Sequence, residues 1–320
     1  MERIDTLSDS YAQPYFALKK YGYRLTNILN NANRWHTKLV CNILDRNSKH
    51  YVSTTYSRQE DYLWLLETTT YLECNSKLSP KIARIYPEDN SIVCNYIGEY
   101  LSNYLLNNPD NISLSITSVF EYLKDINSIE QHKRKFIIPS IMDETFQLIE
   151  GFCDDFVFLS KTKAILPQLV DADIKFIYGC GIEDPHIWNF RILKSRDKVE
   201  ALTTDFDYFQ DKINCFWELG YFYATFRWLK RSSFILAHQA EKILLTLTEK
   251  FDLKSKFMFW LGVLSSFCGY RDSLLNLIKE NEISNLKQQH MIIQGLDERV
   301  SYLANKLLCF SPAKEVISIK

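Results

Sequence analysis

The sequence predicts an α+β protein with two lobes, a small antiparallel-sheet lobe followed by a larger and mainly helical one. Two observations predict this class. Short β-prone runs separated by turn residues fill the chain up to Ile97, and long segments with apolar residues at three- and four-residue spacing dominate after Gly98. We therefore expect a first lobe over residues 1–97 and a helical lobe over residues 98–320.

The first lobe is expected to contain four strands and one helix. Residues 38–56 hold two β-prone runs around the turn-rich stretch 45–48, which is typical of a hairpin. An amphipathic helix over residues 58–73 follows Ser57, a possible N-cap. Residues 79–86 and 91–97 then predict two further strands around a turn. The expected order is strand, strand, helix, strand, strand.

The second lobe is expected to be helical, with one strand and one hairpin embedded in it. Amphipathic segments cover residues 113–129, 139–152 and 158–170. Residues 173–180 predict a short buried strand, and residues 189–206 predict a hairpin that turns at 195–198. From Asn214 onwards the pattern is again helical.

Composition excludes several classes of function. The 320 residues include 38 basic and 39 acidic side chains, so no overall field attracts nucleic acid or an anionic membrane. The eight cysteines contain no C-x-x-C pair, which argues against a zinc module and favours reduced thiols. No apolar stretch reaches the roughly 20 residues of a membrane helix. We expect a cytoplasmic protein; the sequence does not indicate an oligomeric state.

Two short motifs carry the chemistry, D-P-H-I-W-N at residues 184–189 and T-D-F-D at residues 204–207. Phosphoryl transfer needs a carboxylate to orient the attacking hydroxyl and oxygen ligands to hold Mg²⁺ on the nucleotide phosphates. Mg²⁺ accepts one or two carboxylate or amide oxygens together with water and phosphate. Asp184, Asn189 and Asp205 are therefore the candidate base and metal ligands.

The two motifs resemble the D-x-H-x-x-N catalytic loop and the I-D-F/W-D/E metal motif of aminoglycoside phosphotransferases and choline kinases, which have a protein-kinase-like fold. The resemblance covers roughly residues 35–230. It implies that Asp184 is the catalytic base, that Asn189 and Asp205 hold Mg²⁺, and that His186 supports the loop. Asp207 is either a second metal ligand or a structural acid such as a helix N-cap.

The same resemblance extends to the nucleotide-binding part of the first lobe. LLETTTYL is similar to the acid-bearing helix, SPKIARIY to the strand that follows it, and SIVCNYIGEYL to the hinge strand. The resemblance implies a nucleotide-binding set made of Val52, Thr54, Glu67, Asn95, Tyr96 and Ile97. Glu67 is equally well read as an acid on the helix surface.

Three departures from the family pattern stand out. Ile182 and Glu183 replace the usual His-Gly before the catalytic Asp, and residues 29–39 contain no glycine-rich phosphate loop. The lysine of the third strand is absent, and Thr54 or Thr55 stands in its place. Lys38, Lys49 and Arg58 are the cations that could substitute for it.

The sequence therefore predicts a phosphotransferase that uses ATP, with GTP not excluded, and Mg²⁺ to phosphorylate a hydroxyl of a small metabolite or antibiotic-like acceptor. The alternative is a catalytically impaired pseudokinase that binds nucleotide or serves as a scaffold. A third possibility is nucleotidyl transfer in the same cleft. The helical spacing of the aromatic residues in 215–229 favours an interpretation of this stretch as part of the hydrophobic core. Alternatively, Trp217, Glu218 and Tyr221 line a pocket for an uncharged or cationic acceptor.

Overall fold

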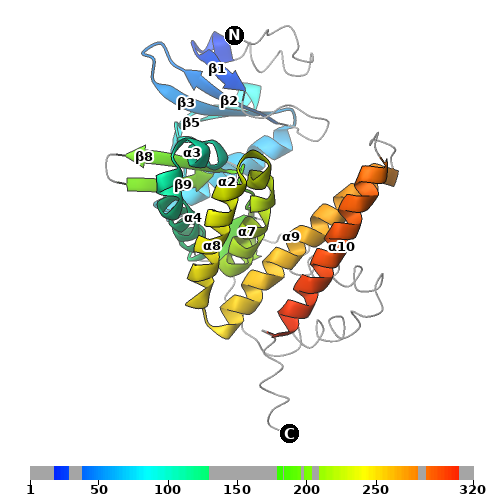
Figure 1. The fold of residues 1–320 in the computed structure, drawn as a ribbon. Helices are drawn as coiled ribbons and strands as arrows, with labels where there is room; N and C mark the ends of the chain where they lie inside the picture. The colour runs from blue at the N-terminus through cyan, green and yellow to red at the C-terminus, as the bar shows by residue number, and fades with distance from the viewer. Residues whose placement is uncertain are drawn as a thin grey trace. The chain divides into compact units, whose positions relative to one another are not determined.

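The structure is a computed structural model that describes residues 18–28, 38–129, 179–182, 184–195, 198–203, 209–279 and 286–309. The chain divides into two compact units (Figure 1). Unit 1 lies within residues 1–100 and 190–208, and unit 2 lies within residues 101–189 and 209–320. Unit 1 contains an antiparallel sheet and unit 2 is mainly helical, so the predicted α+β class is confirmed.

Unit 1 is built on a five-stranded antiparallel sheet in the order β1-β2-β3-β5-β4. The helix α2 (Gln59–Asn75) follows β3, as the sequence predicts. The first strand was not predicted, because its short polar sequence RLTNI lacks an apolar alternation. The strands are β1 (Arg24–Ile28), β2 (Lys38–Leu44), β3 (His50–Tyr56), β4 (Ile82–Tyr86) and β5 (Ser91–Asn95).

The two faces of this sheet pack against different partners. Directly paired residues share a face, so Val40 of β2, Thr54 of β3 and Ile92 of β5 lie in one row. Thr54 and Ile92 meet Leu65 and Thr69 of α2, and we call this side of the sheet the α2 face. The opposite face buries a separate apolar cluster formed by Leu18, Leu39, Cys41, Ile43 and Val93.

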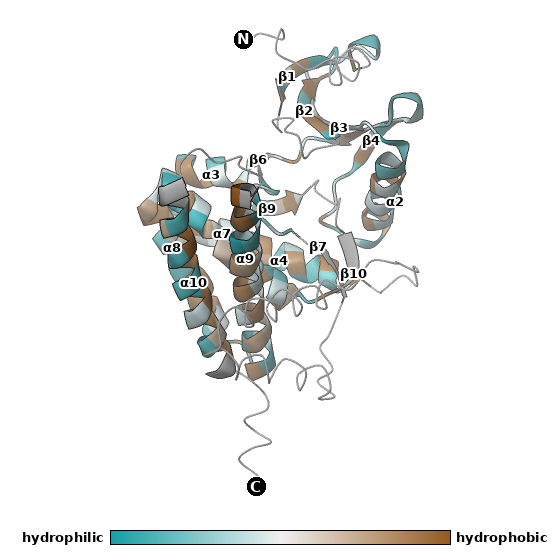
Figure 2. Cartoon of the chain, turned by 90° about the vertical axis from the view of Figure 1, so that its right-hand side faces the viewer, coloured by the Kyte–Doolittle hydropathy of each residue, from teal (hydrophilic) through white to brown (hydrophobic). Residues whose placement is uncertain are grey.

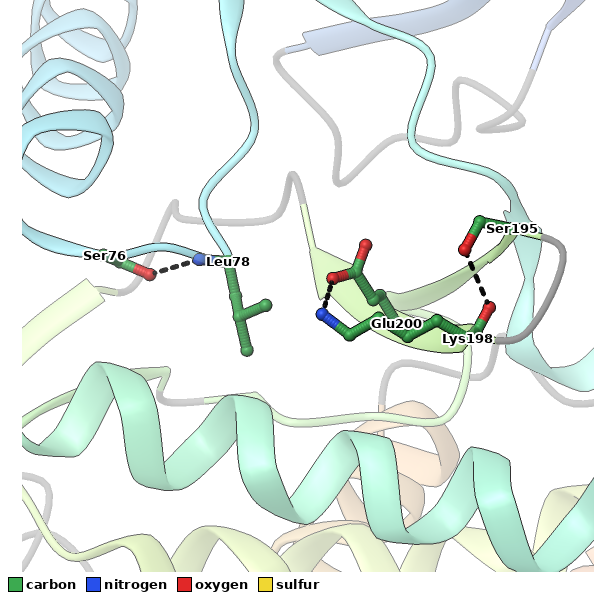
Figure 3. A network of polar contacts seen from close by, with 5 residues as sticks. All are labelled: Ser76, Leu78, Ser195, Lys198 and Glu200. Carbon is green, nitrogen blue, oxygen red and sulfur yellow. Dashed lines mark hydrogen bonds and ion pairs between the residues drawn. The ribbon is translucent and has the colours of Figure 1, made fainter.

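A three-stranded sheet of β6 (Glu99–Tyr100), β8 (Phe190–Ser195) and β9 (Lys198–Thr203) completes unit 1. It contains the predicted hairpin, whose end is closed by polar contacts of Lys198 with Ser195 and Glu200 (Figure 3). Gly98 precedes β6 with a φ of 94°, and a Cβ there would collide with the Ile192 carbonyl oxygen. The hairpin groups with unit 1 because β8 pairs with β6. The predicted lobe boundary at 97/98 stays a prediction.

Unit 2 is organised around α7, which packs against α8 and α9, while α10 runs alongside α9 (Figure 1). The helices of unit 2 carry both hydrophilic and hydrophobic residues (Figure 2), as expected of amphipathic helices. None of the described helices is both long and apolar enough to cross a bilayer. The helices are α3 (Leu101–Asn107), α4 (Ile112–Asn127), α7 (Cys215–Ser232), α8 (Phe234–Glu249), α9 (Leu253–Lys279) and α10 (Leu286–Cys309).

Two strands join these helices, β7 (Gly179–Ile182) and β10 (Phe209–Ile213), which pair antiparallel. The predicted helix over 113–129 corresponds to α4. The helices predicted over 139–152 and 158–170 lie outside the described residues, as does most of the strand predicted over 173–180.

Helices α7 and α9 approach each other through two glycines. A Cβ built at Gly220 of α7 would collide with the carbonyl oxygen of Phe259, and one at Gly262 of α9 would collide with that of Trp217. Each glycine therefore receives the backbone of the opposite helix. Glycine costs about 1 kcal/mol relative to alanine inside a helix, so its presence here reflects the close contact.

Substitution at this crossing should destabilise the fold. Gly220→Ala forces the helices apart, and we expect the free energy of unfolding to fall by about 1–3 kcal/mol. Gly295→Ala in α10 is the matched control, because a Cβ there meets nothing within 4 Å. The control should gain roughly 0.5–1 kcal/mol from helix propensity. Urea unfolding of both variants measures the difference; a gain of equal size at both positions would contradict the close crossing.

Candidate functional site

The loop of residues 184–189 connects β7 to β8 and is closed by hydrogen bonds between its own ends. The side-chain amide of Asn189 donates to the Asp184 carbonyl oxygen at 2.9 Å and to its carboxylate Oδ2 at 3.3 Å. The backbone N–H of Asn189 donates to the His186 carbonyl at 2.8 Å. The five-residue spacing noticed in the sequence thus brings Asp184 and Asn189 into direct contact.

Helix α7 anchors the middle of this loop. The backbone N–H of Ile187 donates to Thr225 Oγ1 at 3.2 Å, and the Thr225 hydroxyl donates in turn to the Phe222 carbonyl at 2.7 Å. The Ile187 side chain is fully buried. A buried side chain and a buried hydrogen bond on the same residue leave the loop little freedom to move away from α7.

The His186 imidazole lies on an aromatic surface and takes part in the loop as a hydrogen-bond acceptor. Its Nδ1 accepts from the Trp188 backbone N–H at 3.2 Å. Its ring lies 4.6 Å from that of Trp188, which lies 5.4 Å from that of Trp228. Burial, assisted by the charge of Arg227, lowers the pKa of His186 to about 3. His186 is therefore neutral at physiological pH, which is the state that its acceptor role requires.

Arg227 of α7 is a cation that interacts electrostatically with both His186 and Asp184. Burial lowers its pKa to about 10, against the opposing effects of Tyr221, Tyr270 and Asp184. The guanidinium donates to Ser266 Oγ at 3.1 Å and lies over the Tyr270 ring at 4.8 Å. Arg227 stays charged at neutral pH and places a positive potential beside both His186 and Asp184.

Strand β7, which leads into the loop, is held by a buried carboxyl group. Glu218 Oε1 accepts from the Ile182 backbone N–H at 2.6 Å, and Glu218 is fully buried. Burial raises the pKa of Glu218 well above its usual value, so the group is favoured in its neutral form. Asn127 at the end of α4 donates to the carbonyls of Cys180 and Ile213 at 3.3 and 2.7 Å. Both strands of this ribbon are therefore tied to helices.

These anchors were not identified from the sequence, and Glu218 was considered as a pocket residue. Trp217 and Glu218 are fully buried, which agrees with the core interpretation of the 215–229 stretch. The signal was nevertheless present. Glu218 and Thr225 lie seven residues apart on an otherwise aromatic segment, which places them on one side of α7. Polar residues in such a row indicate hydrogen bonds to a neighbouring backbone.

In unit 1, Val52 and Thr54 lie on the α2 face, as the alternation of β3 requires. They line a small cavity of about 10 Å³, closed by Leu65 and Thr69 of α2. Glu67 is exposed and lies on another side of the helix. Asp61 and Glu73 are both half-buried, one turn before Leu65 and one turn after Thr69, so both lie on the side of α2 that faces the sheet. Glu73 Oε2 accepts from the Ile82 backbone N–H of β4 at 3.2 Å.

The three hinge residues continue from β5. Asn95 donates its backbone N–H to the Lys81 carbonyl at 2.9 Å, and Ile97 is buried. Tyr96 is half-buried, and burial raises the pKa of its hydroxyl. Asp205 and Asp207 lie outside the described residues, so their positions stay predictions.

Unit 2 contains a groove of about 420 Å³ between α7, α8, α9 and α10. Its size falls in the range of small-molecule sites. Arg227, whose charge interacts with that of Asp184, is one of the residues that line this groove. Its other charged residues are Lys230, Glu241 and Arg299, and Lys230 and Glu241 form an ion pair at 2.6 Å. A Cβ at Gly295 on the wall of this groove would meet open space.

Comparisons with known proteins define the class of fold. No family model matches the sequence, and no curated protein matches it either. Solved structures of small-molecule kinases do match over nearly the whole chain, and the chain has their protein-kinase-like fold.

Three of these structures illustrate the similarity. Amicoumacin kinase hAmiN, solved with AMP-PNP, Ca²⁺ and Ami, has a TM-score of 0.54 at 11% identity, covering 94% of this chain and 96% of its own. A choline/ethanolamine kinase family protein from Mesorhizobium loti has a TM-score of 0.51 at 11% identity, covering 89% and 92%. Choline kinase LicA from Streptococcus pneumoniae has a TM-score of 0.51 at 11% identity, covering 93% and 100%.

The buried Glu218 carboxyl gives a pH-dependent prediction. Because its pKa is raised in the folded state, its contribution to stability is complete below pH 4.5 and declines as pH rises towards the raised value. Glu218→Gln keeps the acceptor oxygen and removes the titration. The stability of this variant relative to the parent should therefore rise between pH 5 and pH 8.

Urea unfolding at several pH values measures this relative stability, with Glu249→Gln at the exposed end of α8 as the control. A difference between Glu218→Gln and the parent that does not change with pH would show that the Glu218 carboxyl titrates normally.

Proposed function

We propose that this protein is a phosphotransferase that transfers a phosphoryl group from ATP, with GTP as the alternative donor, to a hydroxyl of a small molecule. The observation that carries the proposal is the loop of residues 184–189, in which Asp184 and Asn189 are joined and held against α7. Its support comes from a fold shared with small-molecule kinases.

In the proposed reaction Asp184 orients the acceptor hydroxyl and accepts its proton as the bond to phosphorus forms. The loop contributes by positioning, because a carboxylate held by its neighbours needs no reorganisation when substrate arrives. Neutral His186 keeps its Nδ1 engaged within the loop and leaves the role of base to Asp184. Arg227 favours the ionised form of Asp184.

Asn189 has the chemistry that a Mg²⁺ ligand requires. Its amide nitrogen donates to Asp184, so its amide oxygen is the atom that would serve as a Mg²⁺ ligand. Asp205 is proposed as the carboxylate ligand, and Asp207 as a second ligand or a structural acid. Bound Mg²⁺ would neutralise charge on the nucleotide phosphates; the protein residues supply its oxygen ligands and its position.

A pseudokinase remains the second candidate, and one observation favours it. Thr54 occupies the α2 face where the resemblance places a phosphate-binding lysine, and it is buried beside Leu65 and Thr69. A threonine hydroxyl cannot neutralise phosphate charge. Turnover is what separates this candidate from the kinase, since both would bind nucleotide.

We propose further that the acceptor binds in the groove lined by Arg227. Trp217 and Glu218 are buried, so of the three residues that could line a pocket for an uncharged or cationic acceptor only Tyr221 is partly exposed. Arg227 and Arg299 of the groove favour an acceptor that carries a negative charge or several hydrogen-bond acceptors. An uncharged acceptor with several hydrogen-bond acceptors agrees with the sequence-based expectation, whereas an anionic one departs from it.

Asp184→Asn tests the proposed base. ADP formation from Mg²⁺-ATP in the presence of a panel of small hydroxyl compounds should fall by about 10²–10⁴-fold. Stabilisation of the protein by Mg²⁺-ATP should persist, at about 2.7 kcal/mol when the nucleotide is present at 100 times its Kd. Asp110→Asn, at an exposed position, is the matched control. A parent protein that is stabilised by nucleotide but forms no ADP would instead support the pseudokinase.

Gly295→Leu tests the proposed acceptor groove. The added side chain occupies open space on the groove wall, so it should raise the KM for the acceptor at least about tenfold with little effect on the KM for ATP. Gln294→Leu, at an exposed neighbouring position of α10, is the control. An unchanged acceptor KM in Gly295→Leu would place the acceptor elsewhere.

A further inference from the structure

We propose that Lys38 of β2 supplies the positive charge that contacts the nucleotide phosphates, in place of the lysine that is absent from β3. This inference rests on the proposed nucleotide-dependent function and identifies a binding residue that the resemblance does not provide. Three observations carry it: the register of β2 on β3, the burial of Lys38, and the positions of the other candidate cations.

The strand register places Lys38 on the same side of the sheet as Thr54. Lys38 pairs with Tyr56, and Val40 pairs with Thr54. Residues two apart in a strand share a face, and directly paired residues do too, so all four lie on the α2 face. Diagonal neighbours in such a ladder are about 7–8 Å apart, a distance that the long lysine side chain can span. The Lys38 ammonium can therefore serve the region that a lysine at position 54 would serve.

Burial separates Lys38 from an ordinary surface lysine. Its exposed fraction is 7%, and among the residues that the structure describes only Lys38 and Arg191 are buried cations. Arg191 has a structural role, because its guanidinium donates to the Gly98 carbonyl and lies over the Tyr100 ring at 4.2 Å. Lysine is rarely buried, because removing an ammonium from water is costly. A buried lysine on the same face as Thr54 is therefore a candidate for a specific role.

The other two candidate cations are exposed. Lys49 is exposed in the β2–β3 turn, and its ammonium lies 5.2 Å from the centre of the Tyr51 ring. Tyr51 packs on the apolar cluster of the opposite face. Arg58 is exposed at the start of α2. Lys38 also begins β2 directly after residues 29–37, the segment that occupies the sequence position of the phosphate loop.

Nucleotide titrations of Lys38→Met and Lys49→Met test this role. Methionine retains most of the apolar stem of lysine and removes only the charge, so the sheet packing should survive. We expect Lys38→Met to weaken ATP binding by about 10- to 100-fold, the range for loss of a charged hydrogen bond. Binding of adenosine, which lacks phosphates, should change less than about twofold. Lys49→Met should bind both ligands as the parent does.

An acyl phosphate of ATP provides a second test that needs no variant. A lysine amine beside the terminal phosphate attacks the acyl carbon, forms an amide, and releases ATP, so peptide mapping reports which lysine lies there. We expect acylation at Lys38, and its suppression by excess ATP.

Equal ATP affinity in Lys38→Met and parent would overturn the inference, as would a parallel loss of adenosine binding or labelling of a different lysine. In each of those cases the parent still binds ATP, and the proposed function stands. A parent that binds no nucleotide would overturn the proposed function together with this inference.

Discussion

The close crossing of α7 and α9 is the constraint on which the candidate site depends. Gly220 and Gly262 let each helix receive the backbone of the other, and this fixes the position of α7 in unit 2. Glu218 and Thr225 of the fixed helix then hold the backbone at Ile182 and Ile187. A short polar loop could not maintain its shape alone, because its few internal hydrogen bonds compete with water. The geometry of the loop is therefore maintained by its contacts with α7.

The electrostatics of the loop follow from the same packing. The environment that buries His186 lowers its pKa to about 3, and burial lowers that of Arg227 to about 10, so one is neutral and the other charged near pH 7. A neutral imidazole can accept the Trp188 N–H, while the guanidinium favours an ionised Asp184. Burial and neighbouring charge thus give His186 and Asp184, which are two residues apart in the sequence, different roles: the neutral imidazole accepts a hydrogen bond and the carboxylate stays ionised.

In unit 1 the organising feature is the alternation of side chains across the sheet. One face is occupied by the apolar cluster around Cys41 and Ile43, and the proposed nucleotide-binding residues Val52 and Thr54 lie on the other, the α2 face. The row that contains Val40 and Thr54 has Lys38 beside it. A lysine on β2 can therefore take the place of a lysine on β3 on the same face of the sheet, because side chains of neighbouring strands on one face lie next to each other. On the helix, Asp61 and Glu73 rather than Glu67 lie on the side towards the sheet.

The sequence by itself determined the class of fold, the strand and helix order from β2 to β5, the β8–β9 hairpin, and the placement of Asp184 and Asn189 in one short loop. These features depend on local periodicity, turn residues and short spacings, which are properties of neighbouring residues. Only the tertiary structure decided that Glu218 is buried, that Gly220 receives a helix backbone, and that Lys38 shares a face with Thr54. Those relations join residues that are distant in the chain, and they are fixed by strand register and by packing between helices, neither of which a local pattern encodes.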